Sequence, residues 1–458
     1  GQTIDGLVIR WPGGAAEEIA GVDVNRRYTI RQGARQAVEV APRRQVAIAP
    51  QRVETAVESG RARILTPSRP PLPRLTYRNA QGAAAEAPTG DDQTTLVNLW
   101  ASWCAPCVEE LRQFAQHEDQ IRRAGVNILA FSVEESPDGS VLTPAAAELL
   151  KQIKFPFTAG RLDDRGVDQL DALQRALLDA QSPLPLPCSF LLDRRGAVCA
   201  IYRGPVDVPQ LLKDVQLIEQ MDAQAFRETA QPHRGRWRRE PDLTNPFQVA
   251  TKLYEGGMND EAIAYLRRLI DIGLARGPDS QRLKPEQLYF FLGTLLEDKA
   301  DYAAAQDAYE VVMRIEPQNQ EVMRRLAEVA AKRGDATKAA GLLELLVRLN
   351  PADASLRFDW AERLAEMGKV NEALTQYRLL GGSPVWQTAT LRAAWLLATH
   401  PDPSVRKPNE AIQLAQRLCD ETGDDNPAHL DALAAAYAAA GQFDEAVTAV
   451  DKALAAAR

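Results

Sequence analysis

Small residues recur along the last two hundred residues of the chain at a spacing that few folds allow. Their spacings are 43, 34, 34, 38 and 35 residues, and the stretches between them show only helical patterns. Such a period in an all-helical region is typical of stacked helical hairpins, in which small residues lie where two helices approach closely. The recurring positions are Ala262, Ala305, Ala339, Ala373, Ala411 and Ala446. One hairpin cannot bury its apolar face alone, so we expect residues 245–458 to form one continuous array.

One repeat, residues 286–319, resembles the tetratricopeptide repeat, whose period is 34 residues. The matching residues are Tyr289, Leu292, Gly293, Leu296, Ala305, Tyr309, Val312 and Pro317. A coiled coil is the alternative, but turns such as Arg333-Gly334-Asp335 interrupt any long heptad pattern. The resemblance implies an all-α solenoid of about six hairpins, with a groove that binds a protein or peptide partner.

Residues 71–223 alternate between strand and helix patterns. Apolar runs of strand length cover residues 94–101, 127–135, 189–193 and 197–204. Helical patterns cover residues 104–125, 143–153, 168–180 and 208–221. This alternation predicts a layered α/β sheet.

Two cysteines follow the first of these strands and open a helix, in the run Trp103-Cys104-Ala105-Pro106-Cys107. That context indicates a thioredoxin-type redox pair. Helix N-termini favour the thiolate, so we expect Cys104 to attack a substrate disulfide and Cys107 to resolve the mixed disulfide. Trp103 can cover the pair and offer apolar surface to a substrate. The alternatives are two bystander thiols or half of a metal site.

The run LVNLWASWCAPCVEEL, residues 96–111, resembles the TlpA-like branch of the thioredoxin superfamily, which consists of extracytoplasmic thiol–disulfide oxidoreductases. Asn98 stands where cytosolic thioredoxin has a buried aspartate that takes the proton from the second cysteine. Glu110 matches the acidic residue that the family carries three positions after the second cysteine. The resemblance implies that Glu110 tunes or shuttles that proton. The alternative is a glutamate on the helix surface, as we expect for Glu109.

A second resemblance to the same family covers residues 187–196, PCSFLLDRRG, against the pattern P-T-T-F-L-I-D-x-x-G. It implies that Pro187 is a cis proline facing the cysteines and that the backbone of Leu186 pairs with an extended substrate. Pro185 is the alternative, but the Phe-Leu-Leu-Asp that follows fixes the register on Pro187. Cys188 replaces the threonine of the family. We expect it beside the redox pair, facing inward, either as a packed small residue or as a third redox thiol.

The remaining cysteines predict no further chemistry. Cys199 lies on a strand pattern and Cys419 on a helical one, so both are expected in the core. The chain has no second C-x-x-C, and its four histidines do not cluster, so we expect no metal site. No sequence feature calls for a cofactor.

Residues 4–33 form short strand patterns around the turn Pro12-Gly13-Gly14. This stretch resembles the tail of the ASPIC/UnbV module. The matching residues are Leu7, Ile9, Trp11, Pro12, Gly14, Asn25, Thr29, Ile30 and Gly33. In that family the module usually follows integrin-like FG-GAP repeats of secreted proteins, so the resemblance implies a larger N-terminal part before residue 1. An ordinary β-hairpin is the alternative.

The whole chain is thus expected to be multidomain, with an α/β thioredoxin fold followed by an all-α tetratricopeptide solenoid and preceded by a short β segment. The expected boundaries are 1–33 for the β segment, 34–70 for a linker with some strand content, 71–223 for the thioredoxin-like domain, 224–244 for a second linker and 245–458 for the array. The formal net charge of −8 disfavours nucleic acid as the main partner. The chain has no run of 18 apolar residues, so the sequence predicts no membrane span.

The expected function is a thiol–disulfide oxidoreductase that reduces protein disulfides through Cys104 and Cys107, while the array binds a protein client or partner. Both resemblances imply an extracytoplasmic location, periplasmic or secreted. One alternative is a scaffold protein in which the thioredoxin fold is only a binding module, although the intact cysteine pair argues against it. A thiol peroxidase is weaker, because that class centres on a T-x-x-C site. The sequence leaves the direction of electron flow open.

Overall fold

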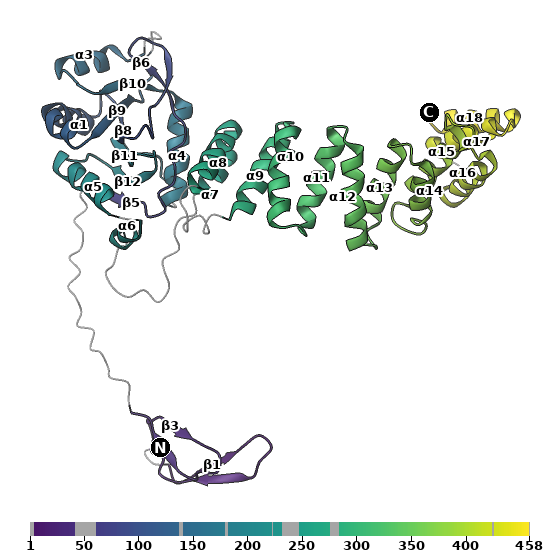
Figure 1. The fold of residues 1–458 in the computed structure, drawn as a ribbon, viewed down its shortest axis with the longest axis horizontal. Helices are drawn as coiled ribbons and strands as arrows, with labels where there is room; N and C mark the ends of the chain where they lie inside the picture. The colour runs from purple at the N-terminus through teal and green to yellow at the C-terminus, as the bar shows by residue number, and fades with distance from the viewer. Residues whose placement is uncertain are drawn as a thin grey trace. The chain divides into compact units, whose positions relative to one another are not determined.

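The computed structural model describes residues 4–41, 61–136, 141–178, 182–221, 223–230, 247–274, 284–423 and 426–457 (Figure 1). The chain divides into two compact units, residues 1–59 and 60–458. In the first unit, β1 (Leu7–Arg10) pairs antiparallel with β2 (Ala16–Ile19), and β3 (Tyr28–Ile30) pairs antiparallel with β4 (Ala37–Glu39). The predicted turn lies between β1 and β2, where the Gly14 N–H donates to the Trp11 carbonyl at 3.1 Å. The expected short strands are therefore present.

A mixed sheet, eight-stranded over the described residues, organises the first half of the second unit. Its strand order is β5-β12-β11-β8-β9-β10-β6-β7. The bounds are β5 (Ala62–Leu65), β6 (Thr76–Asn79), β7 (Ala84–Glu86), β8 (Thr94–Trp100), β9 (Val126–Ser132), β10 (Thr158–Leu162), β11 (Cys188–Leu192) and β12 (Val198–Arg203). The central strand β8 is buried along its whole length, which explains its continuous apolar sequence. The edge strand β5 falls within residues 34–70, interpreted as a linker with some strand content; residues 42–60 of that range lie outside the described residues.

The helices described alongside this sheet are α1 (Ala105–Gln116), α2 (Glu118–Arg123), α3 (Pro144–Gln152), α4 (Asp164–Leu178), α5 (Val208–Gln220) and α6 (Ala223–Ala230). The single helix expected over residues 104–125 is wrong, because the chain kinks at His117 and continues as α2. The His117 backbone leaves helical geometry, and the Gln113 carbonyl lies 2.9 Å from the His117 ring Nδ1 while it also accepts the His117 N–H at 3.1 Å. The short strands β6, β7 and β10 were not expected from the sequence, and α6 extends into the range assigned to the second linker.

The two faces of the sheet support two different hydrophobic clusters. On β8, Leu96 and Trp100 join the cluster that contains α1 and α5 residues, whereas Val97 and Leu99 join the cluster that contains α4 residues. This division follows from the two-residue period of a strand. The redox pair is therefore built on one face, and the other face is available for packing against the rest of the chain.

Further helices form successive pairs along the second half of the unit (Figure 1). They are α7 (Phe247–Glu255), α8 (Asn259–Leu274), α9 (Pro285–Asp298), α10 (Tyr302–Ile315), α11 (Gln320–Lys332), α12 (Ala336–Leu349), α13 (Ala354–Glu366), α14 (Val370–Arg378), α15 (Trp386–Thr399), α16 (Pro408–Thr422), α17 (Pro427–Ala439) and α18 (Phe443–Ala456). The expected fold class, an α/β sheet followed by a helical-repeat array, is confirmed. Within the described ranges, no helix is both long enough and apolar enough to cross a bilayer.

The first helix pair of the array shares a hydrophobic core with the sheet. Val249 and Leu253 of α7 and Leu266 of α8 belong to the same buried cluster as Leu170 and Leu173 of α4. Polar contacts reinforce this interface: the Arg268 guanidinium of α8 donates to the carbonyls of Leu72 at 3.0 Å and Thr89 at 3.3 Å, and Arg165 pairs with Glu261 at 2.5 Å. The array is thus packed directly onto the redox half of the chain.

Close helix packing within the array depends on Gly293 of α9. A Cβ atom at this position would lie 2.6 Å from the Tyr309 ring of α10. We expect Gly293→Ala to lower the free energy of unfolding by about 1–3 kcal/mol, since the buried ring must shift. Gly341 of α12 is the matched control, because a Cβ atom added there would have no neighbour within 4 Å; Gly341→Ala should stabilise by up to about 1 kcal/mol. Urea unfolding of both variants tests this, and equal effects would contradict it.

Candidate active site

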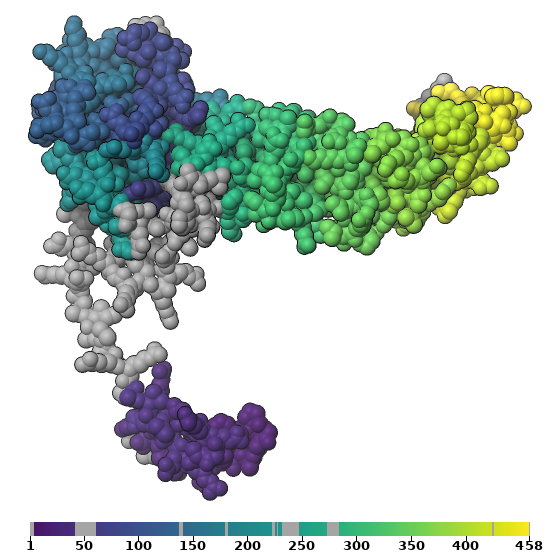
Figure 2. Space-filling view, in the orientation of Figure 1, coloured from purple at the N-terminus to yellow at the C-terminus, as the bar shows by residue number. Residues whose placement is uncertain are grey.

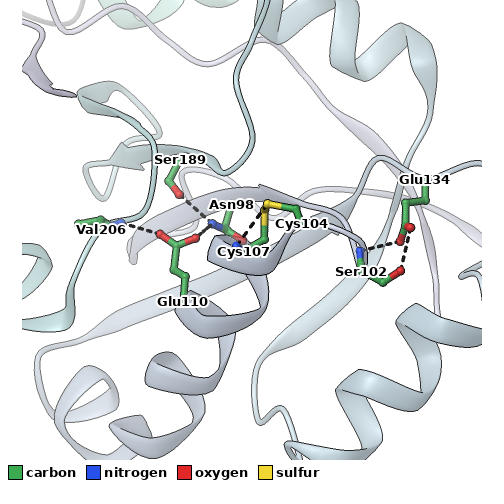
Figure 3. Close-up of a disulfide and its surroundings, with 8 residues drawn as sticks. All are labelled: Asn98, Ser102, Cys104, Cys107, Glu110, Glu134, Ser189 and Val206. Atoms are coloured by element: carbon green, nitrogen blue, oxygen red, sulfur yellow. Dashed lines mark hydrogen bonds between the residues drawn. A yellow bond between two sulfur atoms is a disulfide. The ribbon is translucent and has the colours of Figure 1, made fainter. Parts of the chain in front are cut away.

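Cys104 and Cys107 form a disulfide at the N-terminus of α1 (Figure 3). Cys104 is the N-cap residue, and its sulfur accepts a hydrogen bond from the Cys107 N–H at 3.3 Å. Pro106 lies in the first turn, where a missing N–H breaks no helical hydrogen bond. When the pair is reduced, the same N–H groups and the helix dipole favour a thiolate on Cys104.

The two sulfurs differ in how a substrate can reach them. Cys104 is 6% exposed and Cys107 is fully buried, so an incoming disulfide meets Cys104 first. Trp103 is 71% exposed. This exposure favours the apolar docking surface that we expected of Trp103 over a side chain packed as a cover on the pair.

Glu110 is buried beneath the pair, one turn after Cys107, and is not a surface glutamate. Its Oε1 accepts a hydrogen bond from the Val206 N–H at 2.7 Å, and its Oε2 accepts one from Asn98 Nδ2 at 2.8 Å. Asn98 also donates to Ser189 Oγ at 2.9 Å, which ties α1 to β8 and β11 (Figure 3). Glu109, by contrast, is exposed as expected.

Burial raises the pKa of Glu110 to about 7, although the hydrogen bonds from Val206 and Asn98 act in the opposite direction. A carboxyl group with this pKa can both accept and release a proton near neutral pH. Glu110 can therefore exchange a proton one turn of α1 away from the buried Cys107.

The loop before β11 borders the cluster that contains both cysteines. The Leu186–Pro187 peptide bond is cis, as predicted. Leu186 packs against the clusters on both faces of the sheet, and the Pro187 carbonyl accepts a hydrogen bond from the Gly204 N–H at 2.9 Å. The loop that carries the cis proline is thus tied to the residue that follows β12.

Cys188 does not face the redox pair, contrary to our expectation. It is buried in the cluster on the opposite face of the sheet, because Pro187 places Ser189, and not Cys188, on the side of Asn98. Burial raises the pKa of the Cys188 thiol to about 12. These facts favour a packed small residue over a third redox thiol. Cys199 and Cys419 are buried, as expected for core residues.

A carboxylate that we did not predict supports the loop before the cysteines. Glu134 accepts hydrogen bonds from the Ser102 N–H at 2.9 Å and from Ser102 Oγ at 2.8 Å (Figure 3). Strands β8 and β9 are parallel, so the residues that follow them meet at the same sheet edge. That rule could have linked Ser102, the second residue after β8, with the acidic end of the run 127–135. Among the described residues, no three His, Cys, Asp or Glu side chains gather as a metal site would require.

A disulfide at a helix N-terminus directly after a central buried strand, together with a cis proline just before the neighbouring strand β11, defines a thioredoxin-like redox domain. Comparison with known proteins agrees. Residues 70–201 match the AhpC/TSA family model, and residues 296–357 match the tetratricopeptide repeat model.

Curated relatives specify the chemistry. The chain is 26% identical over 149 residues to the thiol-disulfide oxidoreductase ResA of Bacillus subtilis. The matched stretch covers 32% of this chain and 73% of that protein. It is 26% identical over 146 residues to the thiol:disulfide interchange protein HelX of Rhodobacter capsulatus, covering 32% and 72%. Among solved structures, StoA from Bacillus subtilis covers 32% of this chain and 98% of its own, with 23% identity and a TM-score of 0.23. The chain therefore carries a thiol–disulfide oxidoreductase domain with its C-x-x-C pair at residues 104 and 107, together with tetratricopeptide repeats.

Proposed function

We propose that this chain reduces disulfides in protein clients, and that its helical array holds the client or a partner. The observation that carries the redox part is the position of the dithiol: a slightly exposed Cys104 at a helix N-terminus, a buried Cys107, and a buried Glu110 whose pKa lies near 7. The TlpA-like sequence around the pair supports the reducing direction.

Each site residue has a distinct role in this proposal. The Cys104 thiolate attacks one sulfur of the client disulfide, and the other client sulfur leaves as a thiolate that takes up a proton. Glu110 accepts the proton of Cys107, whose sulfur then attacks Cys104 and releases the second client thiol. Two electrons pass to the client, and the Cys104–Cys107 disulfide forms. Pro187 shapes the loop on which the client backbone docks, and Trp103 offers it apolar surface.

The finer description of the chain is part of the same proposal. Residues 1–33 would be the tail of an ASPIC/UnbV-like module, 71–223 the redox domain and 245–458 the array, joined by connectors at 34–70 and 224–244. The resemblances to the TlpA-like branch and to ASPIC/UnbV support an extracytoplasmic, periplasmic location. An extracytoplasmic reductase needs an electron donor that restores its dithiol, and a membrane donor fits this requirement.

The reduction potential of the pair tests the direction of electron transfer. The protein is equilibrated in dithiothreitol or glutathione buffers, and thiols are trapped for mass spectrometry. We expect a potential near that of thioredoxin, about −270 mV. A value near −120 mV, as in the oxidant DsbA, would contradict a reductase. Absence of a reversible two-electron couple would favour the scaffold function.

The role of the array is tested by shortening it. Removal of residues 245–458 is unsuitable, because α7 and α8 cover apolar residues of α4. A chain that ends at Asn350 keeps α7 to α12. We expect it to reduce a small disulfide such as oxidised glutathione at the same rate as the whole chain, and a protein client more slowly. If the shortened and the whole chain reduced the protein client at the same rate, as well as the small disulfide, client binding by the removed part would be contradicted.

A further inference from the structure

The loop that ends in the cis proline has few backbone groups with which to hold its own shape. It covers residues 182–187, with the sequence SPLPLP, so every second residue lacks an N–H group. After Ser182, the loop's N–H donors belong to Leu184 and Leu186 alone. A segment with so few donors cannot fix its position by hydrogen bonds of its own, so contacts from other elements must do so.

Helix α4 supplies these contacts through Asp171 and Gln174. The Leu184 N–H donates to Asp171 Oδ1 at 3.1 Å. Gln174 Nε2 donates to the Ser182 carbonyl at 3.1 Å and also to Asp171 Oδ1 at 3.1 Å. Arg175 Nε donates to the second carboxylate oxygen, Oδ2, at 2.5 Å. Two donors on α4 therefore hold the carboxylate in place, and the loop amide meets an acceptor with a fixed orientation.

The contact between Asp171 and the loop is sheltered from water. The Asp171 side chain is 21% exposed, and Gln174 is fully buried. A hydrogen bond to a carboxylate is stronger than one to a neutral acceptor. Asp171 is therefore the stronger of the two side chains that hold the loop. On the other edge of the loop, Arg203 of β12 donates to Ser182 Oγ at 2.9 Å.

Helix α4 also supports the array. Leu170 and Leu173 on its apolar side belong to the same buried cluster as Leu253 of α7. The array, coloured green to yellow in Figure 2, adjoins the redox half of the unit along this helix. At 3.6 residues per turn, Asp171 lies on a different side of α4 from Leu170 and Leu173. One helix therefore contacts both the array and the loop.

We propose that Asp171 is a positioning residue for client reduction, which acts on the Leu186 backbone through the Leu184 N–H. The inference rests on the proposed function, in which the loop docks the client backbone. Within the part of the chain that the structure describes, nothing accepts the Leu186 N–H, so a client strand can pair with it. Only Pro185 separates Leu184 from Leu186, and its ring restricts the backbone, so release of Leu184 would displace the docking group.

Amide hydrogen exchange, followed by NMR, tests whether Asp171 holds the loop, and it needs no client. We expect Asp171→Ala to speed exchange of the Leu184 amide by at least about tenfold. Asp171→Asn keeps an Oδ1 acceptor and should preserve most of the protection. Asp168→Ala is the matched control, because Asp168 is an exposed carboxylate one turn earlier on α4. Equal exchange of the Leu184 amide in Asp171→Ala and in the unchanged protein would overturn the proposal.

Steady-state kinetics tests the effect on reduction, with insulin as the protein disulfide and oxidised glutathione as the small one. Asp171→Ala should raise the KM for insulin by about tenfold, change kcat less, and impair glutathione reduction much less than insulin reduction. Asp171→Asn should recover most of the loss, and Asp168→Ala should behave like the unchanged protein. The reduction potential of the cysteine pair should stay the same, because α4 packs on the opposite face of the sheet.

Two kinetic results would also overturn the proposal. One is an equal fall in kcat/KM for insulin and for glutathione in Asp171→Ala, with a changed reduction potential, since general damage to the redox domain would cause both. The other is an Asp171→Asn variant as impaired as Asp171→Ala. Failure of the proposed function is distinguishable from these, because the unchanged protein would then not reduce insulin, while the Leu184 amide would still report whether Asp171 holds the loop.

Discussion

Replacing Cys107 by serine is expected to turn the protein into a trap for its clients. Cys104 remains at the helix N-terminus and can still attack, but no thiol is left to resolve the mixed disulfide. Turnover should fall by at least about a thousandfold, as when one member of a catalytic set is removed. Non-reducing electrophoresis and mass spectrometry should show a client joined to Cys104.

The reverse substitution is the control for this trap. Cys104→Ser should abolish turnover equally but trap nothing, because the remaining Cys107 is fully buried. Equal trapping by both variants would mean that the two sulfurs are equally accessible, and the assignment of Cys104 as the attacking residue would be wrong. A Cys188→Ala variant should keep its activity, since that thiol faces the other side of the sheet.

Replacing Glu110 by glutamine should slow the step that deprotonates Cys107 by about 10²–10⁴-fold, the usual contribution of a general base. In the unchanged protein, the rate should rise with pH through the pKa of Glu110, about 7. This rise of the rate with pH should be absent in Glu110→Gln. The variant should fold, because Asn98 Oδ1 has no hydrogen-bond partner among the described residues and can accept from the new amide once the Asn98 amide turns over. An unchanged pH profile would contradict proton transfer by Glu110.

The same group makes the stability of the protein depend on pH. The pKa of Glu110 is raised in the folded state, from 4.5 to about 7, so the folded protein binds more protons than the unfolded chain within this range. The free energy of unfolding should therefore fall as pH rises from about 4.5 to 7, by roughly 3 kcal/mol in total. Above about pH 7, this group should cause no further change. The difference in unfolding free energy between the unchanged protein and Glu110→Gln isolates this contribution.

The sequence was informative where local patterns and chemistry coincide. A buried strand, the Cys-x-x-Cys run and the periodic alanines each depend on neighbours in the chain, and they predicted the sheet core, the position of the pair and the array. The strands β6, β7 and β10 were missed because each has five residues or fewer and gains its stability from pairing with other strands of the sheet.

The parts of the site that were missed are held by contacts between distant residues. Glu134 reaches Ser102 across 32 positions, and Val206 reaches Glu110 across 96. Whether Glu110 was buried or solvated depended on these contacts, so local sequence left both alternatives open. Cys188 was assigned to the wrong face because its position beside Pro187 was considered without the alternation of β11.

The core shared by α4, α7 and α8 has a consequence for which clients the protein can serve. If the array were held only by a chain segment, a bound client would sample many positions, and its disulfide would meet Cys104 at an average effective concentration. Packing of the first helix pair onto the sheet replaces that average by a fixed geometry. A fixed geometry gives a high effective concentration to disulfides at one distance from the bound segment and almost none to the others. Client choice would then depend on reach as well as on affinity, and inserting or deleting one helix pair would change which disulfide of a client is reduced.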